Sequence, residues 1–113
     1  MKKLISTMVL LGFSALPALG AVASYQNVPL LDVNCSKKAA ASPDSHTRDC
    51  ALACAKSGFG IITKDQHFLK FDAAGNTKIM DALKDSSKKD HLRVNVSGDV
   101  QGDTLKVSSV KLL

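Results

Sequence analysis

A histidine and two cysteines recur at intervals of four residues, at His46, Cys50 and Cys54. On a helix, residues four apart project from nearly the same side, with Cβ atoms about 5 to 6 Å apart. Imidazole nitrogen and thiolate sulfur bind zinc tetrahedrally, at about 2.0 to 2.1 Å and about 2.3 Å. Cys35, on an upstream strand, supplies a fourth ligand of the same kind. The spacing predicts a metal site formed by Cys35, Cys50, Cys54 and His46, for Zn or, because its donors are soft, for Cu(I).

The same cysteines allow two other interpretations. A disulfide between Cys35 and either Cys50 or Cys54 would staple a strand to a helix and stabilise the fold by about 3 kcal/mol. A Cys50–Cys54 bond is disfavoured, because Cβ atoms about 5 to 6 Å apart miss the roughly 3.8 Å that a relaxed disulfide needs. A thiol redox protein is the third interpretation, although its reactive cysteine belongs at a helix N-terminus and Cys50 lies two turns inside the predicted helix. The chain has three cysteines, so at least one is free, ligand-bound or paired with another molecule.

The other polar candidates carry less chemistry. His67 and His91 begin predicted strands and are expected on the surface. Asp32 is expected on the opposite strand face from Cys35, where it would cap a turn, so no catalytic role is predicted for it. The chain contains no nucleophile elbow, glycine-rich phosphate loop, HExxH pair or paired glutamates, which predicts a protein that is not an enzyme.

The N-terminus has the layout of a secretory signal peptide. Two lysines precede an apolar run, Leu4–Leu16, and small residues then predict cleavage after Ala23, with a cut after Gly20 as the alternative. We therefore expect a signal peptide at residues 1–23 and one exported domain at residues 24–113. The apolar run is too short for a convincing membrane span, so the predicted location is the periplasm or the exterior, in soluble form.

Composition limits the classes of partner. The chain carries 15 Lys and Arg against 10 acidic residues, all of them aspartates, for a net charge of +5. The positive residues are dispersed among the aspartates and few aromatic residues could stack on bases, so no nucleic-acid partner is expected. The sequence predicts neither a specific partner nor an oligomeric state.

The alternation of apolar residues and the helix start and stop signals predict a strand and a helix around the cysteines. Residues 25–35 alternate in a strand whose last residue, Cys35, is directed into the interior. Pro29 confines the start of that strand to an edge or a bulge. Ser42-Pro43 begins a predicted helix over residues 43–57, and Gly58 ends it.

The rest of the chain is predicted as two hairpins separated by a short helix. Residues 59–63 and 67–71 form the first hairpin, and Asn76 is the expected N-cap of the helix. Residues 91–100 and 104–113 form the second hairpin, with a bulge where the apolar phase shifts at Ser108-Ser109. The order of elements predicts an α+β fold. It is a small five-stranded OB-like Greek-key barrel, with a cysteine-bearing helix between strands 1 and 2 and a short helix between strands 3 and 4.

Several short motifs also resemble a known group. They are D-x-x-C at 32–35, C-x-x-x-C-A at 50–55, the following Gly58, and V-x-V-x-G at 94–98. Together they resemble small exported bacterial proteins with an OB-like barrel and no assigned activity. The resemblance implies the fold rather than a function. We therefore expect an exported, non-enzymatic binding protein that holds a thiophilic metal ion. A disulfide-stapled interaction or ligand-binding barrel and a thiol redox protein are the alternatives.

Overall fold

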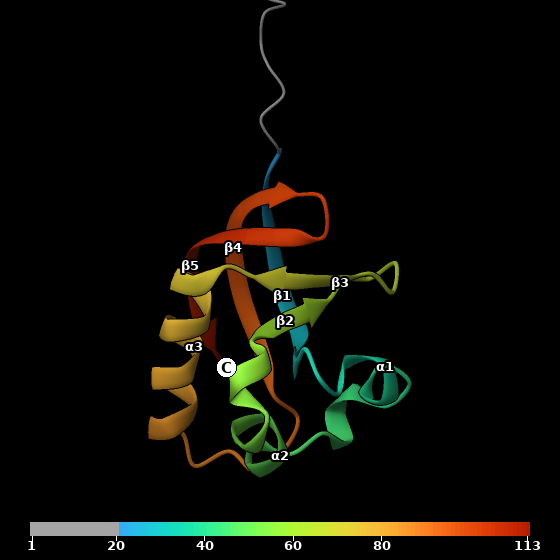
Figure 1. The fold of residues 1–113 in the computed structure, drawn as a ribbon, viewed down its shortest axis with the longest axis vertical. Coiled ribbons are helices and arrows are strands. Elements are labelled where there is room, and N and C mark those ends of the chain that lie inside the picture. Colours follow the sequence, from blue (N-terminus) through green and yellow to red (C-terminus); the bar gives the residue numbers. More distant parts are fainter. Residues whose placement is uncertain (1–20) are drawn as a thin grey trace, which may run out of the picture.

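The computed structural model of the protein describes residues 21–113, in which five strands close into a barrel (Figure 1). The strands are β1 (Ala21–Asp32), β2 (Phe59–Ile62), β3 (Phe68–Phe71), β4 (Arg93–Gln101) and β5 (Thr104–Leu112). They follow the order β1-β2-β3-β5-β4, and every neighbouring pair is antiparallel except the parallel pair β3 and β5. The small α+β barrel is confirmed, and its OB-like Greek-key assignment stays a prediction.

Both predicted hairpins form. In the first, Gly60 pairs with Lys70 and Ile62 with Phe68. In the second, Ser97 pairs with Ser109 and the next residue of β4, Gly98, pairs with Val107. Ser108 is thus the extra residue on β5, at the bulge that the phase shift predicts. A bulge bends and twists its strand, which helps a short sheet to close on itself.

Helix α3 (Ala73–Asp85) connects β3 to β4 and covers part of the barrel. Its N-cap is Asp72, whose carboxylate accepts from the backbone N–H of Gly75 and also from that of Val107. Asn76, the predicted N-cap, lies inside the helix, and its side-chain oxygen accepts from the N–H of Phe59 in β2. The helix starts earlier than predicted because Asp72 satisfies an N–H of the first turn and an N–H of β5 together.

A single core fills the barrel and continues beneath α3. It includes side chains from all five strands and from the helices α2 and α3. The largest fully buried members are Phe59, Leu30, Leu31, Ile61, Ile79, Leu83, Leu92 and Leu105.

The segment between β1 and β2 is a chain of short helical pieces. They are α1 (Ser36–Ala39), η2 (Pro43–Ser45), α2 (Arg48–Ala53) and η3 (Ala55–Ser57). The predicted continuous helix over 43–57 is wrong, because the chain becomes extended at His46 and Thr47, and the Thr47 side chain accepts from the N–H of Cys50 to cap a new helix. Gly58 ends the last piece with a φ of +88°, as predicted.

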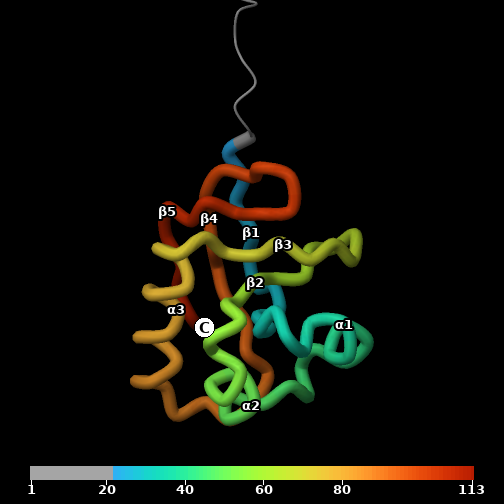
Figure 2. Tube along the Cα trace, viewed as in Figure 1, coloured from blue at the N-terminus to red at the C-terminus, as the bar shows by residue number. Residues whose placement is uncertain are grey.

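Figures 1 and 2 show this helical insert at the end of the barrel where β1 finishes, away from the β4–β5 turn. Strand β1 ends at Asp32, so Cys35 lies in the turn that follows rather than on the strand. The insert thus covers one end of the barrel, and Asp32 and Cys35 lie at the junction.

Most of the predicted signal peptide lies outside the described residues. Strand β1 begins at Ala21 and pairs with β4 from its first residue. The predicted cut after Ala23 would therefore remove the first three residues of β1, whereas the alternative cut after Gly20 would keep the strand whole. Within residues 21–113, no helix has the length and apolar character needed to cross a bilayer.

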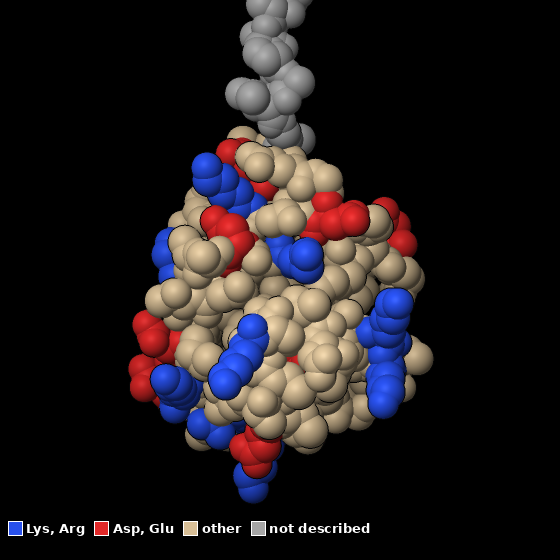
Figure 3. Space-filling view, in the orientation of Figure 1, with Lys and Arg blue, Asp and Glu red and all other residues tan. Residues whose placement is uncertain are grey.

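Charged side chains are spread over the face drawn in Figure 3. Lysine and arginine side chains alternate there with aspartates, and uncharged surface separates them. This face presents both signs of charge without a continuous region of either.

Candidate metal centre

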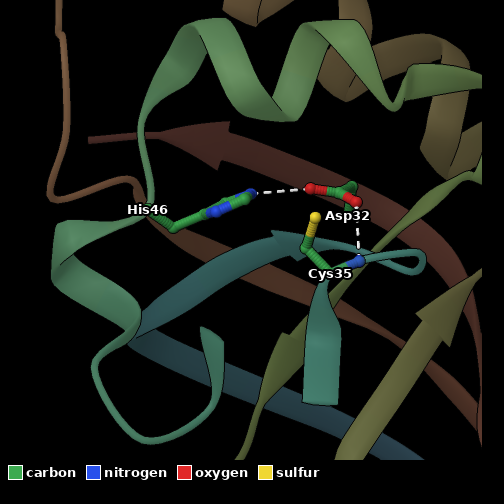
Figure 4. Close-up of side chains that lie close together, drawn as sticks. All are labelled: Asp32, Cys35 and His46. Atoms are coloured by element: carbon green, nitrogen blue, oxygen red, sulfur yellow. Dashed lines mark hydrogen bonds and ion pairs between the residues drawn. The ribbon is translucent and has the colours of Figure 1, made fainter. Parts of the chain in front are cut away.

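Three potential metal ligands converge where β1 meets the helical insert: Asp32, Cys35 and His46. One ligand atom from each lies within 4.8 Å of the other two. Figure 4 shows the imidazole of His46 directed at the carboxylate of Asp32, with the sulfur of Cys35 pointing toward the pair. The three residues come from the end of a strand, the following turn and the extended segment between η2 and α2.

Asp32 is the centre of this group. It is completely buried, an uncommon position for a carboxylate. Its Oδ1 lies 2.6 Å from His46 Nε2, and its Oδ2 accepts from the backbone N–H of Cys35 at 2.9 Å. Asp32 thus caps the turn as predicted. The same carboxylate also contacts both His46 and Cys35, which was not predicted.

His46 is nearly buried, with 8% of its side chain exposed. It occupies a stretch without regular hydrogen bonding, so its position depends on its neighbours. On one side, Arg93 of β4 binds Asp44 through Nε and Nη2, at 2.9 Å each. On the other side, Arg48 donates from Nε to the carbonyl of Leu83 near the end of α3, at 2.8 Å. The two arginines fix the residues two before and two after His46.

The ion pair with Arg93 also has an electrostatic consequence. The hydrogen bonds and charge of Arg93 lower the pKa of Asp44, and Asp44 in turn raises the pKa of Arg93. A bidentate arginine–carboxylate pair is geometrically specific, so it fixes the orientation of η2 relative to β4 as well as its distance from β4.

Cys35 is half-buried and is a free thiol. Burial, the charge of Asp32, and the hydrogen bond and charge of Cys54 together raise the pKa of Cys35 to about 11. At neutral pH and without a cation, the sulfur therefore stays protonated. A bound cation would lower the pKa of Cys35, because its positive charge would stabilise the thiolate.

The other two cysteines occupy different environments. Cys54 is half-buried and neighbours Cys35, and its sulfur accepts from the side-chain amide of Asn34 at 3.6 Å. Cys50 is exposed. The predicted ridge of His46, Cys50 and Cys54 does not form, because His46 precedes α2 instead of lying in the same helix. All three cysteines are free thiols in the structure, which contains no disulfide among them.

The three ligand atoms lie within 4.8 Å of one another, which is the range in which side chains can share one metal ion. In a tetrahedral zinc site, an oxygen and a nitrogen ligand lie about 3.3 Å apart, and a sulfur lies about 3.6 Å from either. Asp32 Oδ1 and His46 Nε2 are 2.6 Å apart, so an ion between them would require a separation by about 0.7 Å. With that separation, the group could hold a metal ion.

Strand alternation does not predict that Asp32 is one of the candidate ligands, because it places Asp32 and Cys35 on opposite faces of the strand. A carboxylate directly after the apolar run Val28–Leu31 and three residues before a cysteine is the available signal, since Asp side chains commonly accept from an N–H a few residues on. Its contact with His46 is long-range and has no local signature.

Comparison of the chain with family models, with curated proteins and with solved structures finds no match in any of the three. The resemblance to small exported barrel proteins stays a prediction.

Proposed function

We propose that the protein is an exported, non-enzymatic zinc-binding protein, periplasmic or secreted, built on an OB-like barrel. Asp32, Cys35 and His46 hold the ion, and Cys54 is the candidate for the fourth position. The observation that carries the proposal is the complete burial of the Asp32 carboxylate between an imidazole and a cysteine. Export rests on the charged, apolar and small-residue pattern of the N-terminus.

The donor set favours zinc over copper(I). Cu(I) selects soft sulfur ligands, whereas zinc accepts sulfur, nitrogen and carboxylate oxygen together. Asp32 contributes a hard oxygen to a group that otherwise resembles the soft set predicted from the sequence. The Asp32 carboxylate and the Cys35 thiolate alone balance the two positive charges of Zn²⁺, and a Cys54 thiolate in the fourth position would add one negative charge.

Catalysis by the same residues has weaker support. A Cys-His-Asp arrangement serves nucleophilic catalysis when the cysteine has a lowered pKa and the histidine activates it. Here the pKa of Cys35 is raised to about 11, and His46 Nε2 is directed at Asp32. A cavity of about 730 Å³ is lined by other residues, among them Tyr25 and His67, so the cysteine group does not lie in it.

Titration of reduced, metal-free protein with Co²⁺ and then Zn²⁺ tests the proposal. We expect one equivalent of Co²⁺ to give the absorption of a tetrahedral thiolate complex, and Zn²⁺ to displace it. Cys35→Ser and His46→Ala should lose that complex.

His67→Ala is the matched control, because His67 Nε2 also pairs with an aspartate, Asp103, at 2.9 Å, but with 54% of its side chain exposed. It should bind Co²⁺ like the wild type. Absence of a stoichiometric complex in the wild type, or equal losses in the two histidine variants, would remove the proposal. A complex with Cu(I) alone would assign the site to copper instead.

A further inference from the structure

Two of the three thiols lie together beside the candidate metal centre. Asn34, the residue before Cys35, donates from its side-chain amide to Cys54 Sγ at 3.6 Å, so Cys54 lies beside the turn that carries Cys35, and both cysteines are half-buried. The third thiol, Cys50, is exposed. The structure therefore distinguishes a pair from a single thiol, which the cysteine spacing does not.

The backbone segments that carry the pair are tied to each other. Val33 donates its N–H to the carbonyl of Gly58 at 2.9 Å, and Asn34 donates its N–H to Ser57 Oγ at 3.0 Å. The amide of Asn34 reaches Cys54 Sγ itself, at 3.6 Å. The first two of these hydrogen bonds hold the turn before Cys35 against the segment after Cys54 without involving either sulfur. Two thiols kept adjacent in this way can form a bond with little reorganisation of the backbone.

We propose that Cys35 and Cys54 are a redox gate on the metal centre, in which a disulfide between them and a bound zinc ion exclude each other. This inference rests on the proposed zinc site. Its reason is that both states use the Cys35 sulfur, which cannot bind a metal as a thiolate while it is bonded to another sulfur. The oxidant is a peroxide, for which hydrogen peroxide is the simplest case.

The chemistry balances with two thiols and one molecule of hydrogen peroxide. The Cys54 sulfur attacks a peroxide oxygen, the O–O bond breaks, and a sulfenic acid at Cys54 and one water molecule form. The second sulfur attacks the sulfenic sulfur, the S–O bond breaks, and the hydroxyl leaves with the second thiol proton as water. The two sulfurs are each oxidised by one electron, and the peroxide is reduced to two molecules of water. A thiol reductant reverses the result and restores the ligand.

Peroxide treatment of the metal-free protein, followed by intact mass and zinc titration, tests the gate. We expect a mass loss of about 2 Da, for two hydrogens, and loss of zinc binding. Both changes should reverse with reductant. Zinc added before the peroxide should slow the mass change.

Variants must identify the bond, because Cys50 and Cys54 share the tryptic peptide 49–56. Cys50→Ser is the matched control and should keep both the link to Cys35 and the loss of zinc binding. Cys54→Ser should lose the 35-linked product. A link that survives Cys54→Ser, or one that disappears in Cys50→Ser, would overturn the assignment.

Two outcomes separate this inference from the proposed function. If the reduced wild type binds no zinc, the zinc site fails and the gate fails with it. If the reduced and the oxidised wild type bind zinc equally, the zinc site stands and only the gate is overturned.

Discussion

Replacing Asp32 by asparagine is the most informative single change. Asparagine keeps the shape and one oxygen acceptor, so the N–H of Cys35 retains a partner, but it removes the charge that His46 contacts at 2.6 Å. A hydrogen bond to a charged group contributes about 1.5 to 3 kcal/mol, and the residue is fully buried, so we expect Asp32→Asn to lower the free energy of unfolding by about that amount. For a domain of this size, the melting temperature falls by roughly 8 to 16 °C.

The same variant should also bind zinc much more weakly than the wild type. Mutation of groups that only support a metal ligand costs about 10- to 100-fold in affinity, so loss of the ligand itself should cost at least about 100-fold. Zinc affinity is measured by chelator competition and stability by urea unfolding of the metal-free protein.

Asp103→Asn is the control, since Asp103 pairs with His67 in the same way at an exposed position, and exposed pairs contribute about 0 to 1 kcal/mol. If Asp32→Asn keeps zinc affinity within a few-fold of the wild type, the carboxylate is not a ligand and the argument for zinc over copper is refuted.

Three further predictions concern the surroundings of the site. Arg93 lowers the pKa of Asp44 below its ordinary 3.8, so this pair stabilises the fold above pH 3.8 and the contribution disappears as the pH falls through the lowered pKa. In Asp44→Asn, the free energy of unfolding in urea should therefore fall less between neutral and acid pH than in the wild type, by at most about 1 kcal/mol. The same pH dependence in the variant and the wild type would contradict this. Alkylation by iodoacetamide at pH 8 should label exposed Cys50 before Cys35, and the rate at Cys35 should rise about tenfold per pH unit toward its pKa of about 11; equal rates would contradict the burial and charge assigned to Cys35. Gly98→Ala should lower stability by about 1 to 3 kcal/mol in thermal unfolding, because a Cβ there would lie 2.1 Å from a backbone carbonyl oxygen of β5, and a neutral result would show that the bulge can relax.

Local pattern predicts the strands of this protein well. Alternation of apolar and polar residues places both hairpins, and the phase shift near Ser108 places the bulge. These features depend on neighbours a few residues apart, which is the range that sequence periodicity reports. The glycine stop at Gly58 is predictable for the same reason, since its φ of +88° favours a residue without a side chain.

The cysteine region was harder to predict because its structure is set by contacts between distant residues. The break at His46 and Thr47 depends on Arg93 holding Asp44 and on Arg48 reaching the end of α3, over 49 and 35 residues of chain. The start signal at Ser42-Pro43 and the stop signal at Gly58 predict one continuous helix instead. Thr47, three residues before Cys50, is the one local signal of a new helix start that was available.

Asp32 shows a second limit of pattern. Leu30, Leu31 and Asp32 are all completely buried, because the barrel interior covers one face of the strand end and the helical insert covers the other. Alternation assigns neighbouring residues to an inside and an outside, and therefore fails where a strand has no exposed face. Alternation therefore predicts the turn contact of Asp32 but not its burial.

A crystal structure of the zinc-loaded protein, with an anomalous difference map at the zinc absorption edge, would locate the bound ion. We expect one strong peak at the end of β1, about 2.0 to 2.2 Å from an oxygen of Asp32 and a nitrogen of His46 and about 2.3 Å from the sulfur of Cys35. An anomalous peak at the exposed Cys50 or at the His67–Asp103 pair, with Asp32 and His46 still in direct contact, would contradict it.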